Sequence, residues 1–266
     1  MSTNPTSAEP TLLVEHRDSI ALVTLNRPER LNALTPEMGP AYARLLQDLD
    51  DDPGTRAIVV TGAGRGFCSG ADLSTLSGSI TDLQGYVSGQ DVSTLPIVAL
   101  TLGTPIVTAI NGPCAGIGFV LAVSADARFV HPDATMSTTF ARLGLVAEYG
   151  IAWLLPRLIG LPAATDLLIT GRTISGARAG ELGLAHVTTD PVGAALGWAA
   201  DVVASSSPAS VATMKRQLIA ADAQVLAEAV AASLVEMSAA FDLPDLAEAL
   251  RARAEKRSPN FPPRSN

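Results

Sequence analysis

Aromatic and charged residues are scarce in this chain. Aromatic residues make up 4% of the 266 positions, so alanine, valine and leucine must fill most of the interior. This composition favours helices packed on a sheet over an aromatic-rich β-sandwich. Charged residues make up 17% and hydrophobic residues 47%. The sequence therefore predicts a globular α/β protein with a large core or a large subunit interface.

Cysteine and histidine are also rare, and they do not cluster. Cys68 and Cys114 lie in unrelated contexts without a C-x-x-C pair, and neither has a histidine-rich neighbourhood. We therefore expect neither a disulfide framework nor a zinc site, and no bound metal ion.

Basic clusters and long apolar runs are missing too. The net charge is -8, and no block of Lys or Arg appears before the last expected helix, which argues against nucleic-acid binding. Every apolar run is interrupted well short of the roughly 20 residues that span a bilayer, so we expect no membrane segment. Residues 1–10 lack the basic and apolar regions of a signal peptide. We expect them to be disordered and the protein to be cytoplasmic.

What the chain does contain is a buried strand, a glycine-rich turn and a helix in succession, and it contains this order twice. A β-branched run over 106–110 is followed by Gly116 and Gly118, which open an apolar segment suited to a packed helix over 119–127. The same order occurs over 57–73. Because the first N–H groups of a helix carry partial positive charge, such a turn can hold an anion or an oxyanion. The glycines can equally serve close helix-strand packing, and these residues alone do not decide between the two.

Periodicity and turn residues predict an α/β core over residues 11–204. The weakly patterned segment 74–93 is interpreted as a mobile segment over a site. The expected strands are 12–16, 20–25, 57–61, 106–110, 127–130 and 135–137, and the expected helices are 35–50, 95–102, 119–127, 151–159, 163–170, 177–182 and 190–204.

Residues 205–266 form a separate, alanine-rich region with helices expected over 208–219, 222–239 and 244–256. It has few residues for a core of its own. We therefore expect it to pack on the main body or on a neighbouring subunit.

Known glycine-rich motifs are not matched. The glycines at 62–66 are followed by Phe67 where G-x-G-x-x-G requires glycine, and no G-K-[ST] follows, which disfavours a nucleotide site. The absence of G-x-S-x-G disfavours a Ser-His-Asp hydrolase. What remains is two turns, 69–72 and 116–118. Two N–H groups directed at one carbonyl oxygen form an oxyanion hole, in which each donor is worth on the order of 3 kcal/mol, and a thioester enolate suits such a hole.

Several motifs in series resemble the crotonase (enoyl-CoA hydratase/isomerase) superfamily, in the right order from about residue 12 to residue 261. They are Leu25-Asn26-Arg27-Pro28 with Asn32-Ala33-Leu34, the run 67–73, the run 105–118, Leu143-Gly144-Leu145 with 155–160, and 168–172.

The resemblance implies a crotonase-like spiral of ββα repeats, with residues 205–266 as a helical trimerisation region and trimers that often pair into hexamers. It implies an acyl-CoA thioester substrate whose carbonyl lies between the N–H groups of Ala71 and Ile117. Coenzyme A is then part of the substrate, and no separate cofactor is expected. The family usually has glycine where this chain has Ile117, so its side chain is expected to narrow the acyl pocket.

The resemblance also implies where coenzyme A binds. The candidates are the turn after the first hairpin, the loop after Ala71, and a basic residue of the last helix in the same or a neighbouring subunit. These positions are Arg30, Leu31, Ala33, Asp72, Leu73 and Lys256. For Arg30 and Lys256, ordinary solvated charge is an equally open interpretation.

The acidic positions depart from the hydratases of the family. Those enzymes carry two glutamates, and the aligned residues here are Val120 and Phe140, which cannot transfer a proton. A carboxylate follows at Glu148, and the run 139–144 before it resembles the peroxisomal-type 3,2-enoyl-CoA isomerases, in which a single glutamate at this place moves the proton. Apolar neighbours predict a raised pKa for Glu148, suited to general base and then acid work. The alternative is a glutamate that merely favours a helix N-terminus.

These residues favour isomerisation of a 3-enoyl to a 2-enoyl thioester with Glu148 as the catalytic residue. Hydration with Glu148 activating water, and a non-catalytic acyl-CoA binder, remain open. Asp72 is interpreted as a helix cap besides its implied contact with coenzyme A, and Asp126 as a residue that fixes the adjoining turn. Arg142 and Arg157 are interpreted as structural ion-pair partners.

Overall fold

The computed structural model describes residues 10–72, 92–94 and 96–264, apart from the side chains of Val92 and Asp222. Residues 1–9 of the expected disordered N-terminus lie outside the described residues. So do Leu73, a candidate coenzyme A contact, and most of the segment 74–93.

Two sheets form the framework of the chain. In the larger one, β1 pairs antiparallel with β2, and every other neighbouring pair is parallel. The larger sheet has the order β1 (Leu12–Arg17), β2 (Ile20–Leu25), β3 (Ala57–Gly62), β4 (Ile106–Ile110), β6 (Ala127–Val130) and β9 (His186–Val187). The smaller has the order β5 (Cys114–Ala115), β7 (Thr135–Ser137) and β8 (Thr173–Ser175).

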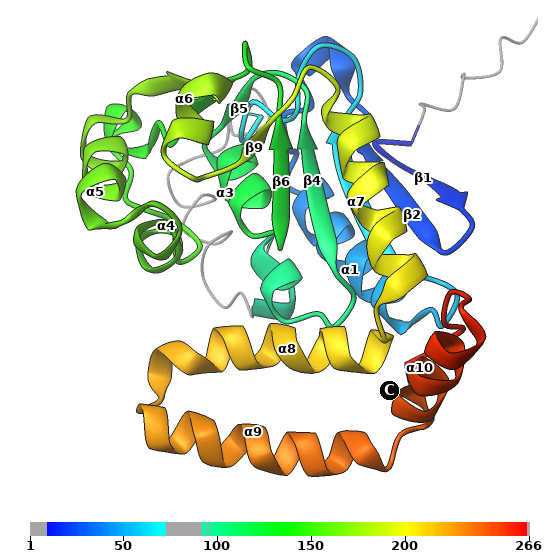
Figure 1. Ribbon diagram of the computed structural model, residues 1–266. Helices are drawn as coiled ribbons and strands as arrows, with labels where there is room; N and C mark the ends of the chain where they lie inside the picture. The colour runs from blue at the N-terminus through cyan, green and yellow to red at the C-terminus, as the bar shows by residue number, and fades with distance from the viewer. Residues whose placement is uncertain (1–9, 73–91, 95, 265–266) are drawn as a thin grey trace, which may run out of the picture.

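The larger sheet is covered on both faces because successive residues of its strands point to opposite sides. On one face, α7 (Pro191–Ser205) lies across the central strands, and its small residues Ala195 and Ala199 are fully buried (Figure 1). On the other, α1 (Met38–Asp51) and α3 (Ile117–Val123) complete a second core. The first core includes Ile20, Leu22, Val59 and Val107, and the second includes Ala21, Val23, Ile58, Val60 and Ile106.

The remaining helices follow in chain order. After β7 come α4 (Ile151–Ile159), α5 (Leu161–Thr170), α6 (Gly176–Glu181), α8 (Pro208–Ala220), α9 (Leu226–Phe241) and α10 (Pro244–Glu255). Short 3-10 helices occupy Pro28–Arg30, Val92–Thr94, Pro96–Leu100, Phe140–Leu143 and Ala221–Ala223.

Four predicted helices differ most from the structure in their start, end or type. The helix expected over 35–50 begins at Met38. The helix expected over 119–127 starts at Ile117 and ends at Val123, because the N–H of Asp126 donates to the C=O of Ile106 (2.8 Å) and directs the chain into β6. The helix expected over 95–102 is a 3-10 helix. The helix expected from 222 begins at Leu226, since Val225 is extended.

Helix α8 lies below the lower end of the sheet (Figure 1) and is attached to it by a largely buried ion pair. Lys215 Nζ lies 2.7 Å from Asp126 Oδ2 and donates to the C=O of Thr104 at 2.9 Å. The same oxygen of Asp126 accepts the N–H of Ile106 at the start of β4 (2.7 Å). Asp126 therefore has the structural role expected of it, and it holds α8 as well as the adjoining turn.

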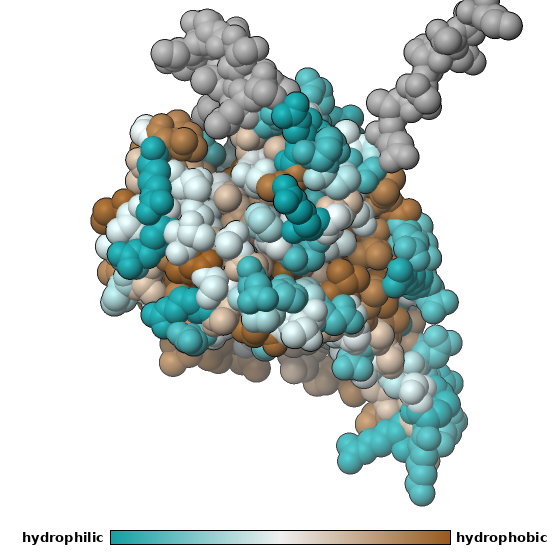
Figure 2. Space-filling view, turned by 90° about the horizontal axis from the view of Figure 1, so that it is seen from above, coloured by the Kyte–Doolittle hydropathy of each residue, from teal (hydrophilic) through white to brown (hydrophobic). Residues whose placement is uncertain are grey.

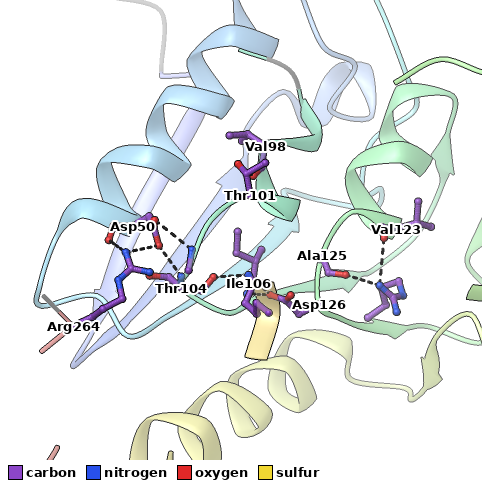
Figure 3. Close-up of polar contacts among 12 residues, drawn as sticks. Asp50, Val98, Thr101, Thr104, Ile106, Val123, Ala125, Asp126 and Arg264 are labelled. Atoms are coloured by element: carbon purple, nitrogen blue, oxygen red, sulfur yellow. Dashed lines mark hydrogen bonds and ion pairs between the residues drawn. The ribbon is translucent and has the colours of Figure 1, made fainter. Parts of the chain in front are cut away.

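A second ion pair ties the C-terminal segment to α1. Arg264 Nη2 lies 3.1 Å from Asp50 Oδ1, which also accepts the N–H of Thr104 (2.6 Å) (Figure 3). Burial by itself would raise the pKa of Asp50, but the hydrogen bonds from Arg264 and Thr104 lower it overall. The carboxylate is therefore held in its charged form.

Helix α9 presents an unusual surface in the single chain. All of its residues are described and none is buried, although many are apolar. Leu226 (81% exposed), Val235 (70%) and Phe241 (63%) are among the most exposed large hydrophobic side chains. A neighbouring subunit would cover such a face, and the trimerisation role of residues 205–266 stays a prediction.

At the opposite end, where the parallel strands end, two asparagines hold the turns together. Asn32 is fully buried with φ 57°, and its Oδ1 accepts the N–H of Arg27 (2.9 Å). Its Nδ2 donates to the C=O groups of Ala63 (3.0 Å) and Gly66 (2.8 Å). Asn111 Nδ2 likewise donates to two carbonyls of the 62–64 turn. Figure 2 looks onto this end of the molecule, where white and light-brown residues lie between groups of hydrophilic ones.

Replacing Lys215 with Met should lower the free energy of unfolding by about 2 kcal/mol, because Asp126 keeps a partly buried charge without its cation. Chemical denaturation measures this loss. Arg178→Met is the matched control, since it breaks an exposed ion pair with Glu181 that should be worth less than about 1 kcal/mol. Equal losses in the two variants would contradict the role assigned to Lys215.

Replacing Asn32 with Ala should cost about 3 kcal/mol of stability, because an N–H and two carbonyl groups that are partly or fully buried lose their partners. The midpoint of urea unfolding measures the effect. Asn26→Ala, which removes only an exposed hydrogen bond to the C=O of Pro10, is the control. An Asn32→Ala protein as stable as the control would show that these three bonds do not hold the turns.

Candidate active site

The two glycine-rich turns lie side by side. Cys68 pairs with Cys114 as a parallel bridge: the N–H of Cys68 donates to the C=O of Pro113 (3.1 Å), and the N–H of Ala115 donates to the C=O of Cys68 (2.9 Å). A Cβ atom on Gly118 would lie 2.2 Å from the oxygen of Cys68, so only glycine allows this approach. The turn after β3 therefore packs directly on the start of α3.

The two cysteines meet in this bridge, although the sequence places them in unrelated contexts. Both are free thiols and fully buried. Burial raises the pKa of Cys68 to about 12 and the pKa of Cys114 well above its ordinary value. Both thiols are therefore neutral, and they serve as packing groups between the turns.

The N–H of Ala71 is directed away from Leu34, the residue that binds both of its neighbours. The C=O of Gly70 accepts the N–H of Leu34, and the N–H of Asp72 donates to the C=O of Leu34, both at 2.8 Å. A trans peptide group holds its C=O and N–H in opposite directions, so the N–H of Ala71 points away from Leu34. It has no hydrogen-bond acceptor in the described part of the chain, and Ala71 is exposed.

The N–H of Ile117 is the first of α3. The C=O of Gly116 accepts the N–H of Val120 (3.2 Å) along the helix, so the N–H of Ile117 points out of the helix N-terminus. Gly116 has φ 54° and ψ -124°, a conformation that glycine adopts without strain. The Ile117 side chain itself is buried.

Both N–H groups belong to peptide groups that start at glycines lying close to each other. A Cβ atom on Gly70 would lie 3.1 Å from the oxygen of Ala115 and 4.0 Å from the Cα of Gly116. Gly70 has φ 112°, which also requires glycine. Two N–H donors are thus available within one small region, an arrangement that can hold a developing negative charge.

Glu148 is half-buried just before α4. Burial raises the pKa of its carboxyl group, and the side chain forms no hydrogen bond or ion pair within the described residues. Gly150 is the N-cap of α4 and no side chain caps this helix. Glu148 therefore does not cap α4 through a side-chain hydrogen bond, and its catalytic role stays a prediction.

The chain segment that leads to Glu148 passes the second glycine turn. The N–H of Gly116 donates to the C=O of Ser137 (3.0 Å), and a Cβ atom on Gly116 would lie 3.4 Å from Thr139 Oγ1. Val120 and Phe140, where the family's hydratases carry glutamates, are both buried in the core. Of these three positions, only Glu148 has a group that can transfer a proton.

Three of the expected coenzyme A contacts lie next to the Ala71 loop. Ser69 donates from its N–H to the C=O of Leu31 (3.0 Å) and from its hydroxyl to the C=O of Arg30 (3.2 Å). The Arg30 side chain is exposed, whereas Ala33 is buried and its C=O accepts Arg27 Nη1 at 2.5 Å.

Lys256 does not lie near the expected coenzyme A contacts beside the Ala71 loop. It ends α10 with φ 55°, and Figure 1 shows α10 at the lower end of the molecule, away from the glycine turns. Within one chain Lys256 does not join Arg30, so a shared role would require a neighbouring subunit.

Asp72 has a partner that the sequence did not reveal. Its carboxylate Oδ2 lies 2.8 Å from Arg27 Nη2, and the two side chains are 7% and 16% exposed. The helix that Asp72 was expected to cap falls on residues outside the description. Arg27 and Asp72 lie in two of the motifs that resemble the family, and their opposite charges are compatible with an ion pair. Many other pairs of opposite charge are equally compatible with the sequence.

Arg142 and Arg157, which the sequence predicted to be structural ion-pair partners, do not make the same kind of contact as each other. The prediction is wrong for Arg142, which is exposed and donates from Nε to the C=O of Thr170 (2.9 Å), without an ion pair among the described residues. The guanidinium of Arg157 lies 4.0 Å from the centre of the Trp153 ring.

Within the described ranges, no cluster of three or more His, Cys, Asp or Glu side chains could bind a metal ion. In the same ranges, no helix has both the length and the apolar character needed to span a bilayer.

Comparison with known proteins places these observations in a family. A family model described as enoyl-CoA hydratase/isomerase matches residues 15–264. A Thermus thermophilus protein assigned as an enoyl-CoA hydratase is 36% identical over 248 residues, covering 91% of this chain and 97% of its own length. A 1,2-epoxyphenylacetyl-CoA isomerase of Escherichia coli is 35% identical over 175 residues, covering 64% and 66%.

The fold agrees with this match. A crystal structure from Mycobacterium abscessus, assigned as an enoyl-CoA hydratase/isomerase, superposes with a TM-score of 0.85 at 34% identity and covers 95% of this chain and 99% of its own. The predicted crotonase-like fold is thus confirmed. This chain belongs to the enoyl-CoA hydratase/isomerase family.

Proposed function

We propose that the protein isomerises a 3-enoyl-CoA thioester to its 2-enoyl isomer, through an enolate held by the N–H groups of Ala71 and Ile117. Family membership supports an acyl-CoA substrate. The finer proposal rests on where this chain carries an acidic side chain. Glu148 is half-buried and its carboxyl group has a raised pKa, while Val120 and Phe140, which stand where the family's hydratases have glutamates, are apolar and buried.

The proposed reaction moves one proton. The Glu148 carboxylate removes a proton from C2, and the electron pair moves onto the thioester oxygen to form a dienolate. The two N–H groups stabilise this charge, each by about 3 kcal/mol in a dry site. The protonated Glu148 then returns the proton to C4, the C2=C3 bond forms, and the thioester carbonyl is restored. One carboxyl group acts as base and then as acid, which suits a pKa above the usual range for glutamate.

Hydration is the second candidate, and it is favoured by the name of the Thermus thermophilus relative. In that reaction Glu148 would activate a water molecule for addition to C3 of a 2-enoyl thioester. The hydratases that the sequence resembles use two carboxyl groups, whereas this chain has apolar, buried side chains at both of those positions, Val120 and Phe140. The proposal therefore prefers isomerisation.

Glu148→Gln should lower kcat for a 3-enoyl-CoA substrate by about 10²- to 10⁴-fold, because the amide cannot accept the proton. The measurement is the ultraviolet band of the conjugated enoyl thioester, which grows on isomerisation and fades on hydration. Glu181→Gln, on the exposed surface of α6, is the control and should keep full activity. If wild-type protein fades the band of a 2-enoyl substrate and does not act on a 3-enoyl one, hydration replaces isomerisation. Tight binding of acyl-CoA without turnover would support a non-catalytic binder.

The raised pKa of Glu148 predicts opposite pH effects on activity and on stability. Activity needs the carboxylate, so kcat/KM should fall as the pH drops through a pKa above the usual glutamate value of about 4.3. The folded state holds the proton more tightly than the unfolded state, so ionisation of Glu148 costs stability as the pH rises through its pKa.

Glu148→Gln should therefore unfold at a higher temperature than wild type at neutral pH. This advantage should vanish below about pH 4, where the carboxyl group is protonated in both the folded and the unfolded states. Thermal unfolding at several pH values measures the difference. A Glu148→Gln protein that is less stable at neutral pH would indicate a structural carboxylate instead.

A further inference from the structure

Arg27 joins two segments that the proposed function uses separately. Its Nη2 lies 2.8 Å from Asp72 Oδ2, and its Nη1 donates to the C=O of Ala33 at 2.5 Å. Asp72 directly follows Ala71, and Ala33 belongs to the turn expected to bind coenzyme A. One largely buried guanidinium group therefore touches the coenzyme A turn and the loop of the first N–H donor.

The backbone of Arg27 is itself fixed. Its N–H donates to Asn32 Oδ1 (2.9 Å), and its C=O accepts the N–H groups of Arg30 and Asn32, both at 2.9 Å. The guanidinium thus extends from a rigid turn, so the position of that turn determines where the Asp72 carboxylate lies.

The loop on the other side of the ion pair controls the direction of the Ala71 N–H. Gly70 and Asp72 each bond to Leu34 at 2.8 Å, so the residue between them is held on both sides. If the Asp72 side chain moves, it displaces the segment 70–72, which includes the N–H of Ala71. Catalytic donors misplaced by about 1 Å can lose on the order of 10²-fold in rate.

We propose that Arg27 is a positioning residue, which acts through Asp72 to hold the Ala71 N–H against the thioester oxygen and couples this donor to the coenzyme A turn. The inference rests on the proposed function, since it concerns the same oxyanion site. Arginine suits this role because its planar fork donates to a carboxylate and a carbonyl at once, whereas the ammonium group of lysine is a single point of charge.

The test follows the polarisation of a bound carbonyl group, because a merely structural role would not change it. A 2,4-dienoyl-CoA is added to protein carrying Glu148→Gln, so that the probe is not consumed, and its ultraviolet band is recorded. Hydrogen bonds from the two N–H groups should move this band to longer wavelength. When Arg27→Met is introduced into the Glu148→Gln protein as a second substitution, the band shift should fall by more than half. The affinity for coenzyme A alone should change less than about threefold.

Two further variants separate positioning from folding. Arg27→Lys keeps the charge but not the fork, and it should recover folding stability without recovering the full band shift. Asp72→Asn, nearly identical in shape, should reduce the shift in the same way. Arg264→Met is the matched control, because it breaks a similarly buried arginine-aspartate pair at the other end of the molecule, and it should leave the shift unchanged.

In protein that retains Glu148, Arg27→Met should lower kcat by about 10- to 100-fold, with KM changed less than about threefold. A full band shift in Arg27→Met, or full recovery of the shift by Arg27→Lys, would overturn the inference and leave the proposed function standing. If the probe shows no shift even with Arg27 present, the oxyanion site itself is wrong, and the proposed function fails together with the inference.

Discussion

The contact between two backbone turns at the upper end of the sheet is the constraint on which the site depends. The oxygen of Cys68 lies where a side chain on Gly118 would be, and a Cβ atom on Gly116 would lie 3.8 Å from the Cα of Gly70. Because a Cβ atom on Gly118 would lie only 2.2 Å from that oxygen, glycine alone allows the first turn of α3 to lie against the loop after β3. Two N–H groups from parts of the chain far apart in sequence become donors in one place as a result.

Around this contact, the buried polar side chains that hold the turns are neutral or hydrogen-bonded, and Glu148 differs from them. The thiols between the turns are buried and neutral, and Asn32 satisfies three backbone groups of the turns. Glu148, by contrast, is half-buried without a partner among the described residues. An ionisable group placed in this way destabilises the folded chain at neutral pH, which is expected where a carboxyl group serves proton transfer instead of structure.

Much of the fold could be predicted from the sequence, because buried strands and amphipathic helices leave a periodic pattern. The strand over 106–110 and the alanine-rich helices Pro208–Ala220 and Pro244–Glu255 agree with their predictions. The end of α3 could not be predicted, since it depends on a hydrogen bond between Asp126 and Ile106, twenty positions apart in sequence. Local pattern contains no information on such a contact.

The site was predicted less completely than the fold. The motifs identified both glycine turns and Glu148, but the pairing of Cys68 with Cys114 is an isolated bridge between two segments that lie far apart in sequence. Arg27 and Asp72 are likewise 45 positions apart, and opposite charge alone does not select one partner among many. The direction of the Ala71 N–H follows from the bonds of its neighbours to Leu34, which only the folded chain shows.

The central claim is that the N–H groups of Ala71 and Ile117 bind the same thioester oxygen. A crystal structure with a saturated acyl-CoA, which cannot react, tests it most directly through two distances. The account predicts that both nitrogen atoms lie about 2.7–3.1 Å from the thioester oxygen. A thioester oxygen that contacts neither nitrogen, in a complex where coenzyme A is fully bound, would contradict it.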